Sequence, residues 1–262
     1  MSIKNLNEVG NYIVDWLTDY LAVTPLRGFI VGVSGGVDSA LTATLCAMTG
    51  KKVTLLNMPI RQTTEEYHRA KNQISALEER FEKVSGITID LTETFNALEQ
   101  IMPEETQNNG LAMANSRARL RMTSLYAIGQ SQGLLVAGTG NKVEDFGVGF
   151  YTKYGDGGVD LSPIADLMKS EVFALAQHLG VIDSILNAKP TDGLWDDDRN
   201  DEDQIGASYD ELEWAMEYTG SIETLSDREK AVIEIYNNYH FQNKHKMEPI
   251  PVCSIPNKFR KD

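Results

Sequence analysis

Residues 29–41 read FIVGVSGGVDSAL, and the rest of the chain is organised around this stretch. Residues 29–33 are apolar, β-branched and aromatic, which predicts a buried strand. Gly35 and Gly36 follow, and glycine adopts backbone angles that side chains forbid and lets a ligand approach the chain closely. Residues 37–48 then predict a helix that begins directly behind the glycines. Because the first turn of a helix presents unpaired N–H groups and partial positive charge, this junction predicts a phosphate-binding loop.

The polar residues of the junction support the same interpretation. Ser34 and Ser39 supply hydroxyl donors, whereas Asp38 places a negative charge beside the expected phosphate. A carboxylate suits that position when a divalent cation lies between it and the phosphate, because hard cations take oxygen ligands from both. A tight strand-to-helix turn with capping serines is the alternative, but six specified residues at one junction favour a nucleotide. No Gly-x-x-x-x-Gly-Lys-Ser/Thr pattern is present, so the loop is not a Walker A motif.

Residues 34–39, SGGVDS, resemble the pyrophosphate-binding loop (PP-loop) of the ATP pyrophosphatases. Members of that superfamily cleave ATP between the α and β phosphates and transfer AMP to a substrate oxygen. The loop alone does not choose among them.

The length, net charge and composition of the sequence argue against several classes of protein. A chain of 262 residues can bury a substantial core, and its net charge of −14 weighs against a nucleic-acid partner, which usually needs a basic surface. No apolar run approaches the roughly 18 residues of a membrane span, and residues 1–5 lack the apolar core of a signal peptide. Cys46 and Cys253 are far apart in the sequence, which fits a reducing cytoplasm and argues against a disulfide framework or a zinc site.

Apolar runs and helical periodicity alternate along the chain. Strands are predicted at residues 29–33, 53–58, 87–91 and 134–137. Helices are predicted at residues 3–22, 37–48, 63–82, 95–102, 109–131, 209–218 and 227–239. Strands separated by helices indicate right-handed crossovers and a parallel sheet, so we expect one α/β domain over residues 1–262. The expected architecture is a three-layer, doubly wound parallel sheet of about five strands with helices on both faces, and ligands should bind at the carboxyl ends of the strands.

A second group of candidate residues follows the strand at 134–137. Residues 138–144 read GTGNKVE, and Val143 stands where a dinucleotide fingerprint needs its last glycine, so that fingerprint carries little weight. Glu144 follows the tip of a neighbouring strand and could complete a magnesium site with Asp38. A solvated glutamate at the start of a helix is the alternative.

The next segment, residues 147–164, is rich in glycine and carries Lys153, Asp156 and Asp160, which predicts a binding loop. Lys169 then opens a helix, where a positive charge opposes the helix dipole unless an anion lies nearby. A surface lysine is the alternative, and we favour a functional role.

Residues 192–203 are dense in Asp and Glu around Trp195. A calcium loop is excluded, because position six of a frame that starts at Asp196 is Asp201 rather than glycine, and position twelve is Ala207 rather than glutamate. Long charged loops are usually disordered or functional, so we expect a mobile acidic lid at about residues 192–207.

Taken in order along the chain, these pieces resemble the ammonia-dependent NAD synthetases. The matching pieces are the SGGVDS loop, NSRARLRM at 115–122, Gly138 and Thr139 with Glu144, TKYGDGG at 152–158, Lys169, Thr191, and His245 with Lys246. The match covers roughly residues 5–250. The order and spacing of the pieces are more diagnostic than any one of them.

The resemblance implies a full set of ligands, with ATP and Mg²⁺ held at the loop and deamido-NAD beside them. The residues implied to cradle the ATP phosphates are Gly32, Val33, Ser34, Gly35, Gly36, Val37, Asp38 and Ser39. Those implied to hold Mg²⁺ are Asp38 and Glu144, and those implied to contact ATP are Thr139, Lys169 and Thr191. Those implied to contact deamido-NAD are Arg119, Lys153, Asp160, His245 and Lys246. A homodimer with deamido-NAD in its interface is also implied.

The implied reaction has two steps. The nicotinate carboxylate attacks the α-phosphate of ATP and releases pyrophosphate, and ammonia then displaces AMP from the adenylate and leaves an amide. Positioning and charge stabilisation suffice for this chemistry, with Asp38, Lys169, Asp156 and Asp160 as the catalytic candidates. The residues leave open whether Asp156 or Asp160 orients or deprotonates ammonium. Glutamine-dependent relatives carry an extra amidase domain, so we expect free ammonia, or ammonia from a separate protein, as the nitrogen source.

The chain departs from the pattern of the resemblance at three places. Residues 140–143 read GNKV where members commonly carry Asp-His-Ala-Ala, and the interval from Glu144 to Lys153 is one residue longer than usual. Residues 59–62 read PIRQ in place of the frequent Pro-Tyr-Gly form.

Two other functions stay open. One is another PP-loop enzyme that amidates or thiolates a nucleotide or a tRNA, and the other is a non-catalytic nucleotide sensor. The acidic total and the lack of a cysteine pair oppose thiolation, and the presence of both Asp38 and Glu144 opposes the sensor.

Overall fold

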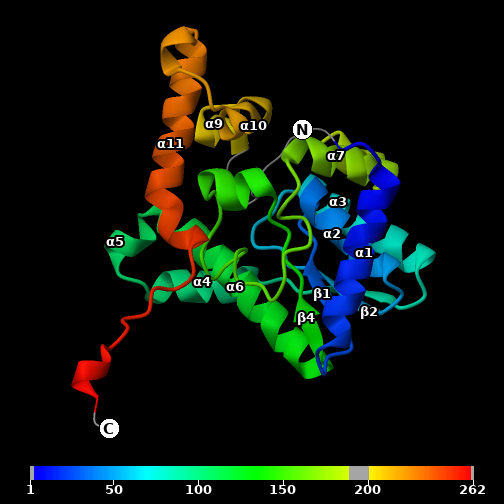
Figure 1. The fold of residues 1–262 in the computed structure, drawn as a ribbon. Coiled ribbons are helices and arrows are strands. Elements are labelled where there is room, and N and C mark those ends of the chain that lie inside the picture. Colours follow the sequence, from blue (N-terminus) through cyan, green and yellow to red (C-terminus); the bar gives the residue numbers. More distant parts are fainter. Residues whose placement is uncertain (1–2, 189–200, 261–262) are drawn as a thin grey trace.

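Four parallel strands form a sheet in the order β3-β2-β1-β4. Their bounds are β1 (Gly28–Gly32), β2 (Lys52–Asn57), β3 (Val84–Thr88) and β4 (Leu134–Val136). The computed structural model describes residues 3–188 and 201–260 and is drawn in Figure 1. In the register of the sheet, Ile30 of β1 pairs with Thr54 of β2 on one side and Val136 of β4 on the other. The chain order reverses between β1 and β4, and ligands of open α/β sheets bind at such a switch point.

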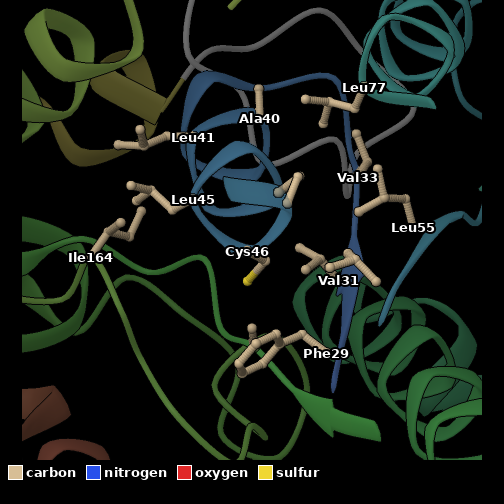
Figure 2. Packing of buried hydrophobic residues seen from close by; sticks show 14 of the residues in the cluster. Phe29, Val31, Val33, Ala40, Leu41, Leu45, Cys46, Leu55, Leu77 and Ile164 are labelled. Atoms are coloured by element: carbon tan, nitrogen blue, oxygen red, sulfur yellow. The ribbon is translucent and has the colours of Figure 1, made fainter. Parts of the chain in front are cut away.

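Helices cover both faces of this sheet. The helices on one face are α1 (Leu6–Ala22), α2 (Val37–Met48), α3 (Thr64–Arg80) and α7 (Lys169–His178), and those on the other are α4 (Thr92–Ile101) and α6 (Gly110–Gln132). Because successive side chains of a strand point to opposite faces, Phe29 and Val31 join the first layer and Ile30 joins the second. Figure 2 shows side chains of β1 and α2 gathered in the first of these clusters. The three-layer, doubly wound architecture that the sequence predicts is confirmed.

The helix behind the glycine loop, α2, is buried along most of its length. Residues 39–47 are all buried, so the helix is apolar on nearly every side. Its two buried threonines both donate hydrogen bonds, Thr44 to the carbonyl of Ala40 at 2.7 Å and Thr42 to the carbonyl of Gly138 at 3.4 Å. The first turn of α2 is therefore held firmly against the end of β1.

The sheet has four strands within the described residues, rather than about five. A single parallel bridge between Ala137 and Leu161 extends it beyond β4. The carboxylate of Asp160 accepts a hydrogen bond from the N–H of Val136 at 2.8 Å, in the place where a neighbouring strand would supply a carbonyl. Pro163, two residues after this bridge, also has no N–H to donate to a sheet.

The third strand begins earlier than the sequence predicts, at residue 84 rather than residue 87. Gly86 explains the difference. A Cβ atom at Gly86 would lie 2.3 Å from Cγ2 of Ile74 in α3, so glycine lets the helix approach this edge strand closely. A glycine inside a strand weakens the apolar pattern from which strands are predicted.

A second apolar cluster is formed by η1 (Val143–Val148), α9 (Asp201–Ile205), α10 (Tyr209–Glu217) and α11 (Asp227–Met247). A short helix, η2 (Ile222–Thr224), lies between α10 and α11 in the chain. Figure 1 shows α9 and α10 beside the upper part of α11. The short helices α5 (Glu104–Gln107), α8 (Asp183–Leu186) and η3 (Asn257–Phe259) complete the described elements. The predicted lid is described only over residues 201–207, and residues 192–200 lie outside the described part of the chain.

Two further observations concern the helices. Helix α11 is eight residues longer than residues 227–239, so Lys244, His245 and Lys246 form its last turn. None of the helices in residues 3–188 and 201–260 combines the length and the apolar character that a membrane crossing requires.

Candidate active site

A cavity lies at the carboxyl ends of β1, β2 and β4, which is where the sequence predicts ligands. The predicted site residues in its wall are Gly32, Val33, Ser34, Gly35, Gly36, Val37, Asp38, Ser39, Thr139, Glu144, Asp156 and Lys169. Its wall continues along Met58 after β2 and Leu125 of α6. The predicted residues outside this wall are Arg119, Lys153, Asp160, His245 and Lys246. Thr191 lies outside the described residues.

The glycine loop is held open by its own hydrogen bonds. The N–H of Ser34 donates to Oγ of Ser39 at 3.2 Å, and the hydroxyl of Ser39 donates to the carbonyl of Gly36 at 3.0 Å. Gly35 has φ +92°, and a Cβ there would lie 2.9 Å from the carbonyl oxygen of Glu66, so no other residue fits. Gly36 is the N-cap of α2 and supplies no side-chain cap. The first N–H groups of α2 are therefore available to an anion in the cavity.

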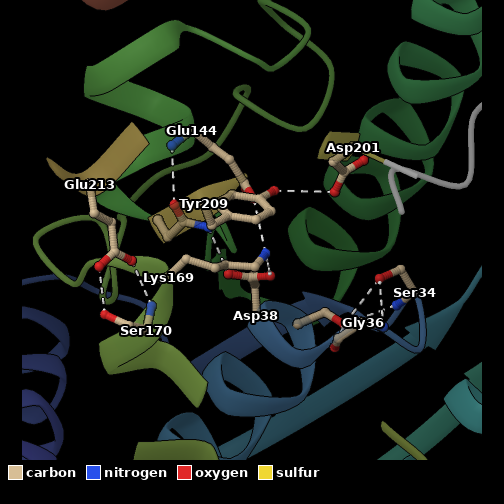
Figure 3. Close-up of polar contacts among 11 residues, drawn as sticks. Ser34, Gly36, Asp38, Glu144, Lys169, Ser170, Asp201, Tyr209 and Glu213 are labelled. Atoms are coloured by element: carbon tan, nitrogen blue, oxygen red, sulfur yellow. Dashed lines mark hydrogen bonds and ion pairs between the residues drawn. The ribbon is translucent and has the colours of Figure 1, made fainter. Parts of the chain in front are cut away.

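Lys169 joins the two predicted metal ligands. Its Nζ lies 2.6 Å from Oδ2 of Asp38 and 3.0 Å from Oε1 of Glu144, and the residue is 3% exposed (Figure 3). Burial opposes the charge of Lys169, but the two carboxylates outweigh it and hold the pKa of the lysine above its ordinary value. Asp38 and Glu144 thus share the ammonium group of Lys169. The two acids come from different strand tips.

Asn141 fixes both acids from a position that the sequence singled out only as a departure. Its side-chain N–H donates to Oδ1 of Asp38 at 2.9 Å, and its Oδ1 accepts the backbone N–H of Glu144 at 3.1 Å. The residue is completely buried. An asparagine can make both contacts because it carries a donor and an acceptor.

The residue after Asn141 leads into a π-helix, η1, over Val143–Val148. A π-helix takes more residues per turn than an α-helix and occurs often at functional sites. It ends at Gly149 with φ +66°, and the N–H of Phe150 closes it on the carbonyl of Glu144 at 2.9 Å.

The structure separates the two aspartates between which the sequence could not choose. Asp156 lines the cavity, and burial raises its pKa to about 6, although Oδ1 accepts the N–H of Thr152 at 3.0 Å. Asp160 instead accepts the N–H of Val136 at 2.8 Å and the hydroxyl of Tyr126 at 3.0 Å. Asp160 therefore has a structural task beside β4, whereas Asp156 faces the space where a substrate would lie.

Comparison with known proteins assigns this geometry to a family. The family model described as NAD synthase matches residues 9–250. The chain belongs to the NAD synthase family. The NH(3)-dependent NAD(+) synthetase of Methanosarcina mazei is 35% identical over 96% of this chain and 99% of its own length. The NH(3)-dependent NAD(+) synthetase of Mycoplasmopsis pulmonis is 40% identical over 81% of this chain and 79% of its own length.

A solved structure agrees with this membership over nearly the whole chain. The NMN synthetase from Francisella tularensis superposes with a TM-score of 0.84 at 31% sequence identity, and the match covers 97% of this chain and 100% of that one. The NH3-dependent NAD synthetase from Campylobacter jejuni shares the same fold, with a TM-score of 0.78 at 24% sequence identity over 95% of this chain and 100% of that one.

In this NAD synthase, the basic residues that the resemblance assigns to deamido-NAD form hydrogen bonds that hold the loop after η1 in place. Nε of Arg119 donates to the carbonyl of Lys153 at 3.3 Å, and Nζ of Lys153 donates to the carbonyl of His245 at 2.7 Å. Nζ of Lys246 donates to the carbonyls of Gly149 and Tyr151 at 2.6 and 2.8 Å. These contacts tie residues 149–158 to α6 and to the last turn of α11. Their assignment to deamido-NAD stays a prediction.

The donor set of the NAD synthase site suits a magnesium ion that also binds phosphate. No group of three or more His, Cys, Asp or Glu side chains that could hold a metal occurs in the part of the chain that is described. Mg²⁺ is usually bound by one or two carboxylates together with substrate phosphates and water. Asp38 and Glu144 meet that requirement, because both already reach the same cationic nitrogen.

Proposed function

We propose that this chain amidates the carboxylate of deamido-NAD with ammonia and ATP, and that it releases NAD, AMP and pyrophosphate. NAD synthases are ligases that use ATP as a substrate. The observation that carries the proposal is the cluster of Asp38, Glu144 and Lys169 in front of the uncapped start of α2. A polyanion there would meet the N–H groups of the loop, the ammonium of Lys169 and a divalent cation held by Asp38 and Glu144.

The proposed chemistry needs no covalent intermediate on the protein. The nicotinate carboxylate attacks the α-phosphorus, and the bond to the β-phosphate breaks as pyrophosphate leaves. Mg²⁺ held by Asp38 and Glu144 would neutralise charge on the phosphates. The N–H groups of the loop and Lys169 would stabilise the charge on the oxygens that pyrophosphate carries away.

In the second step ammonia attacks the acyl carbon of the adenylate, and the bond to AMP breaks. Ammonium must lose a proton before it can attack, and Asp156 is the carboxylate that lines the cavity. We propose that Asp156 accepts that proton, because its pKa of about 6 leaves it ionised at neutral pH yet more basic than an ordinary aspartate.

A specific observation favours a second acceptor. The Francisella tularensis protein, which matches this chain over almost its entire length, is an NMN synthetase. Its acceptor would be the mononucleotide of nicotinate rather than the dinucleotide, and the reacting carboxylate is the same. Nicotinate mononucleotide is therefore the alternative acceptor for this chain.

The experiment that tests the function compares acceptors. Purified chain receives ATP, Mg²⁺ and ammonium with deamido-NAD, nicotinate mononucleotide, xanthosine monophosphate or tRNA, and pyrophosphate and amide are measured. We expect the highest kcat/KM with deamido-NAD, and no product when glutamine replaces ammonium. A higher kcat/KM with the mononucleotide would shift the assignment to that acceptor. Turnover with xanthosine monophosphate or tRNA alone, or no turnover with any acceptor, would refute the proposal.

We also propose that the chain acts as a homodimer, which the C-terminal arm, residues 248–260, supports. The arm leaves the last turn of α11 and runs away from the other elements (Figure 1). Within the described residues, the backbone hydrogen bonds of residues 249–260 stay inside the arm. Its apolar side chains are 50–83% exposed, namely Ile250, Val252, Ile255 and Phe259. Exposed apolar side chains grouped on one segment are typical of an interaction site, and Leu111 and Phe241 are exposed apolar side chains on α6 and α11.

Removal of the arm should therefore change the oligomeric state. We expect light scattering to give twice the chain mass of 29.1 kDa for the full protein and a monomer for the protein without residues 249–262. Ile255→Asp should weaken the dimer, whereas Lys258→Ala, in the same arm, should leave it intact. A full-length monomer would contradict the homodimer, and a dimer that persists without the arm would contradict the role of the arm in it.

A cytoplasmic location is also proposed. It is supported by the two cysteines, because Cys46 is buried, Cys253 is exposed, and both are free thiols. Free thiols of this kind are typical of a reducing compartment.

A further inference from the structure

Tyr209, the first residue of α10, touches both the acid and the lysine of the candidate metal site. Its hydroxyl donates to Oε1 of Glu144 at 2.5 Å, and Nζ of Lys169 lies 4.7 Å from the centre of its ring. The residue is 5% exposed (Figure 3). One buried side chain therefore contacts two residues that come from different segments of the chain, η1 and α7.

The hydroxyl of Tyr209 is a donor in these contacts. A tyrosine hydroxyl carries its proton at neutral pH, and a carboxylate oxygen can only accept a hydrogen bond. It has one hydrogen and two carboxylate neighbours, since Oδ2 of Asp201 lies 3.2 Å away. The shorter distance to Glu144 makes that residue the acceptor, and the contact with Asp201 limits the rotation of the hydroxyl.

The backbone around Tyr209 is fixed as well. Its N–H donates to Oε1 of Glu202 at 2.8 Å, and Ser208 caps the helix through the N–H of Glu211. One turn along α10, the carboxylate of Glu213 accepts the N–H and the hydroxyl of Ser170, both at 2.7 Å. Residues four apart lie on the same face of a helix, so one face of α10 holds Glu144 and the residue next to Lys169.

We propose that Tyr209 is a positioning residue of the metal site, which orients Glu144 through its hydroxyl and Lys169 through its ring. The proposal rests on the proposed function only in taking Glu144 as a ligand of the divalent cation. Groups that hydrogen-bond to metal ligands orient those ligands, and their removal typically weakens metal binding by about 10- to 100-fold.

Tyr209→Phe tests the hydroxyl alone, because it keeps the ring beside Lys169. Binding of Mn²⁺ is measured by electron paramagnetic resonance with a non-hydrolysable ATP analogue, together with the Mg²⁺ dependence of turnover. We expect the dissociation constant of Mn²⁺ to rise by about 10- to 100-fold. Excess Mg²⁺ should restore kcat, and the KM of the acceptor should stay unchanged. Tyr209→Leu, which also removes the ring, should in addition raise the KM of ATP.

Tyr218→Phe is the matched control. Tyr218 caps the other end of α10, and its hydroxyl donates to the carbonyl of Ser221 at 2.9 Å, away from the site. We expect it to bind Mn²⁺ as the unchanged protein does. The proposal is overturned if Tyr209→Phe and Tyr218→Phe bind Mn²⁺ equally, or if the unchanged protein binds none. If the amidation assay fails but Tyr209→Phe still binds Mn²⁺ more weakly than Tyr218→Phe, the proposed function is refuted and this inference stands.

Discussion

Lys169→Met is expected to lower the free energy of unfolding by about 3–5 kcal/mol and to slow pyrophosphate release by at least about 10²–10³-fold. The lysine is 3% exposed, and its ammonium lies between two carboxylates. Its removal leaves Asp38 and Glu144 facing each other in a buried site, which is the costly case for an ion pair. Urea denaturation and a pyrophosphate assay measure the two effects.

The sign of the pH dependence follows from the direction of the lysine shift. The pKa of Lys169 is higher in the folded state, so its stabilising contribution is complete below the unfolded value and is lost as the pH rises through the folded one. The loss in Lys169→Met should therefore be equal at pH 7 and pH 9. Lys142→Met is the control, because its partner Asp166 is almost fully exposed and such pairs contribute at most about 1 kcal/mol. Equal stability losses in the two variants would contradict the arrangement.

Asp156→Asn is expected to reduce kcat with ammonium by about 10²–10⁴-fold, the usual contribution of a positioned proton acceptor. The carboxyl is protonated below its pKa of about 6 and cannot then accept a proton from ammonium. Activity of the unchanged protein should rise through about pH 6, and the variant should lack this rise. The charged and titratable groups that act on Asp156 or feel its charge are Glu144, Asp145, Tyr151 and Lys246.

Stability provides an independent readout for the same variant. A carboxyl whose pKa is raised by burial destabilises the folded state once it ionises, so stability falls between about pH 4 and pH 6. Asp156→Asn should therefore be slightly more stable than the unchanged protein at pH 8, by less than about 1 kcal/mol, because Asp156 is exposed to the water of the open cavity, which screens its charge. Asp160→Asn should instead lose about 1–2 kcal/mol, because Asp160 satisfies Val136 and Tyr126. If Asp160→Asn removed the rise in activity and Asp156→Asn kept it, the two roles would be reversed.

The sequence allowed the glycine loop to be predicted because all its determinants are local. An apolar strand, two glycines and a helix start follow one another within residues 29–41, and the structure has β1 and α2 there. The meeting of Asp38 with Glu144 could also be predicted, since the carboxyl ends of neighbouring parallel strands lie at the same edge of the sheet. Here the structure brings both acids to Lys169.

The residues that support this centre could not be predicted from local patterns. Tyr209 reaches Glu144 across 65 residues of sequence, and Asn141 reaches Asp38 across 103. A tyrosine at a helix start and an asparagine after glycine have many ordinary explanations, so nothing in their neighbourhood singles them out. Asn141 carried one signal, because it lies in a segment where the chain departs from the pattern of the resemblance. The start of β3 was missed for a similar reason, since Gly86 acts through its contact with α3.

The two cysteines lie in contrasting surroundings, so a thiol reagent should modify them at different rates. Cys46 is wholly enclosed between α2 and the sheet, and burial raises the pKa of its thiol, so a thiol reagent reaches it when those layers separate. Cys253 stands on the exposed arm and meets the reagent at once unless another copy covers it. A single labelling time course therefore reports, at two separate rates, the association of the arm and the opening of the core.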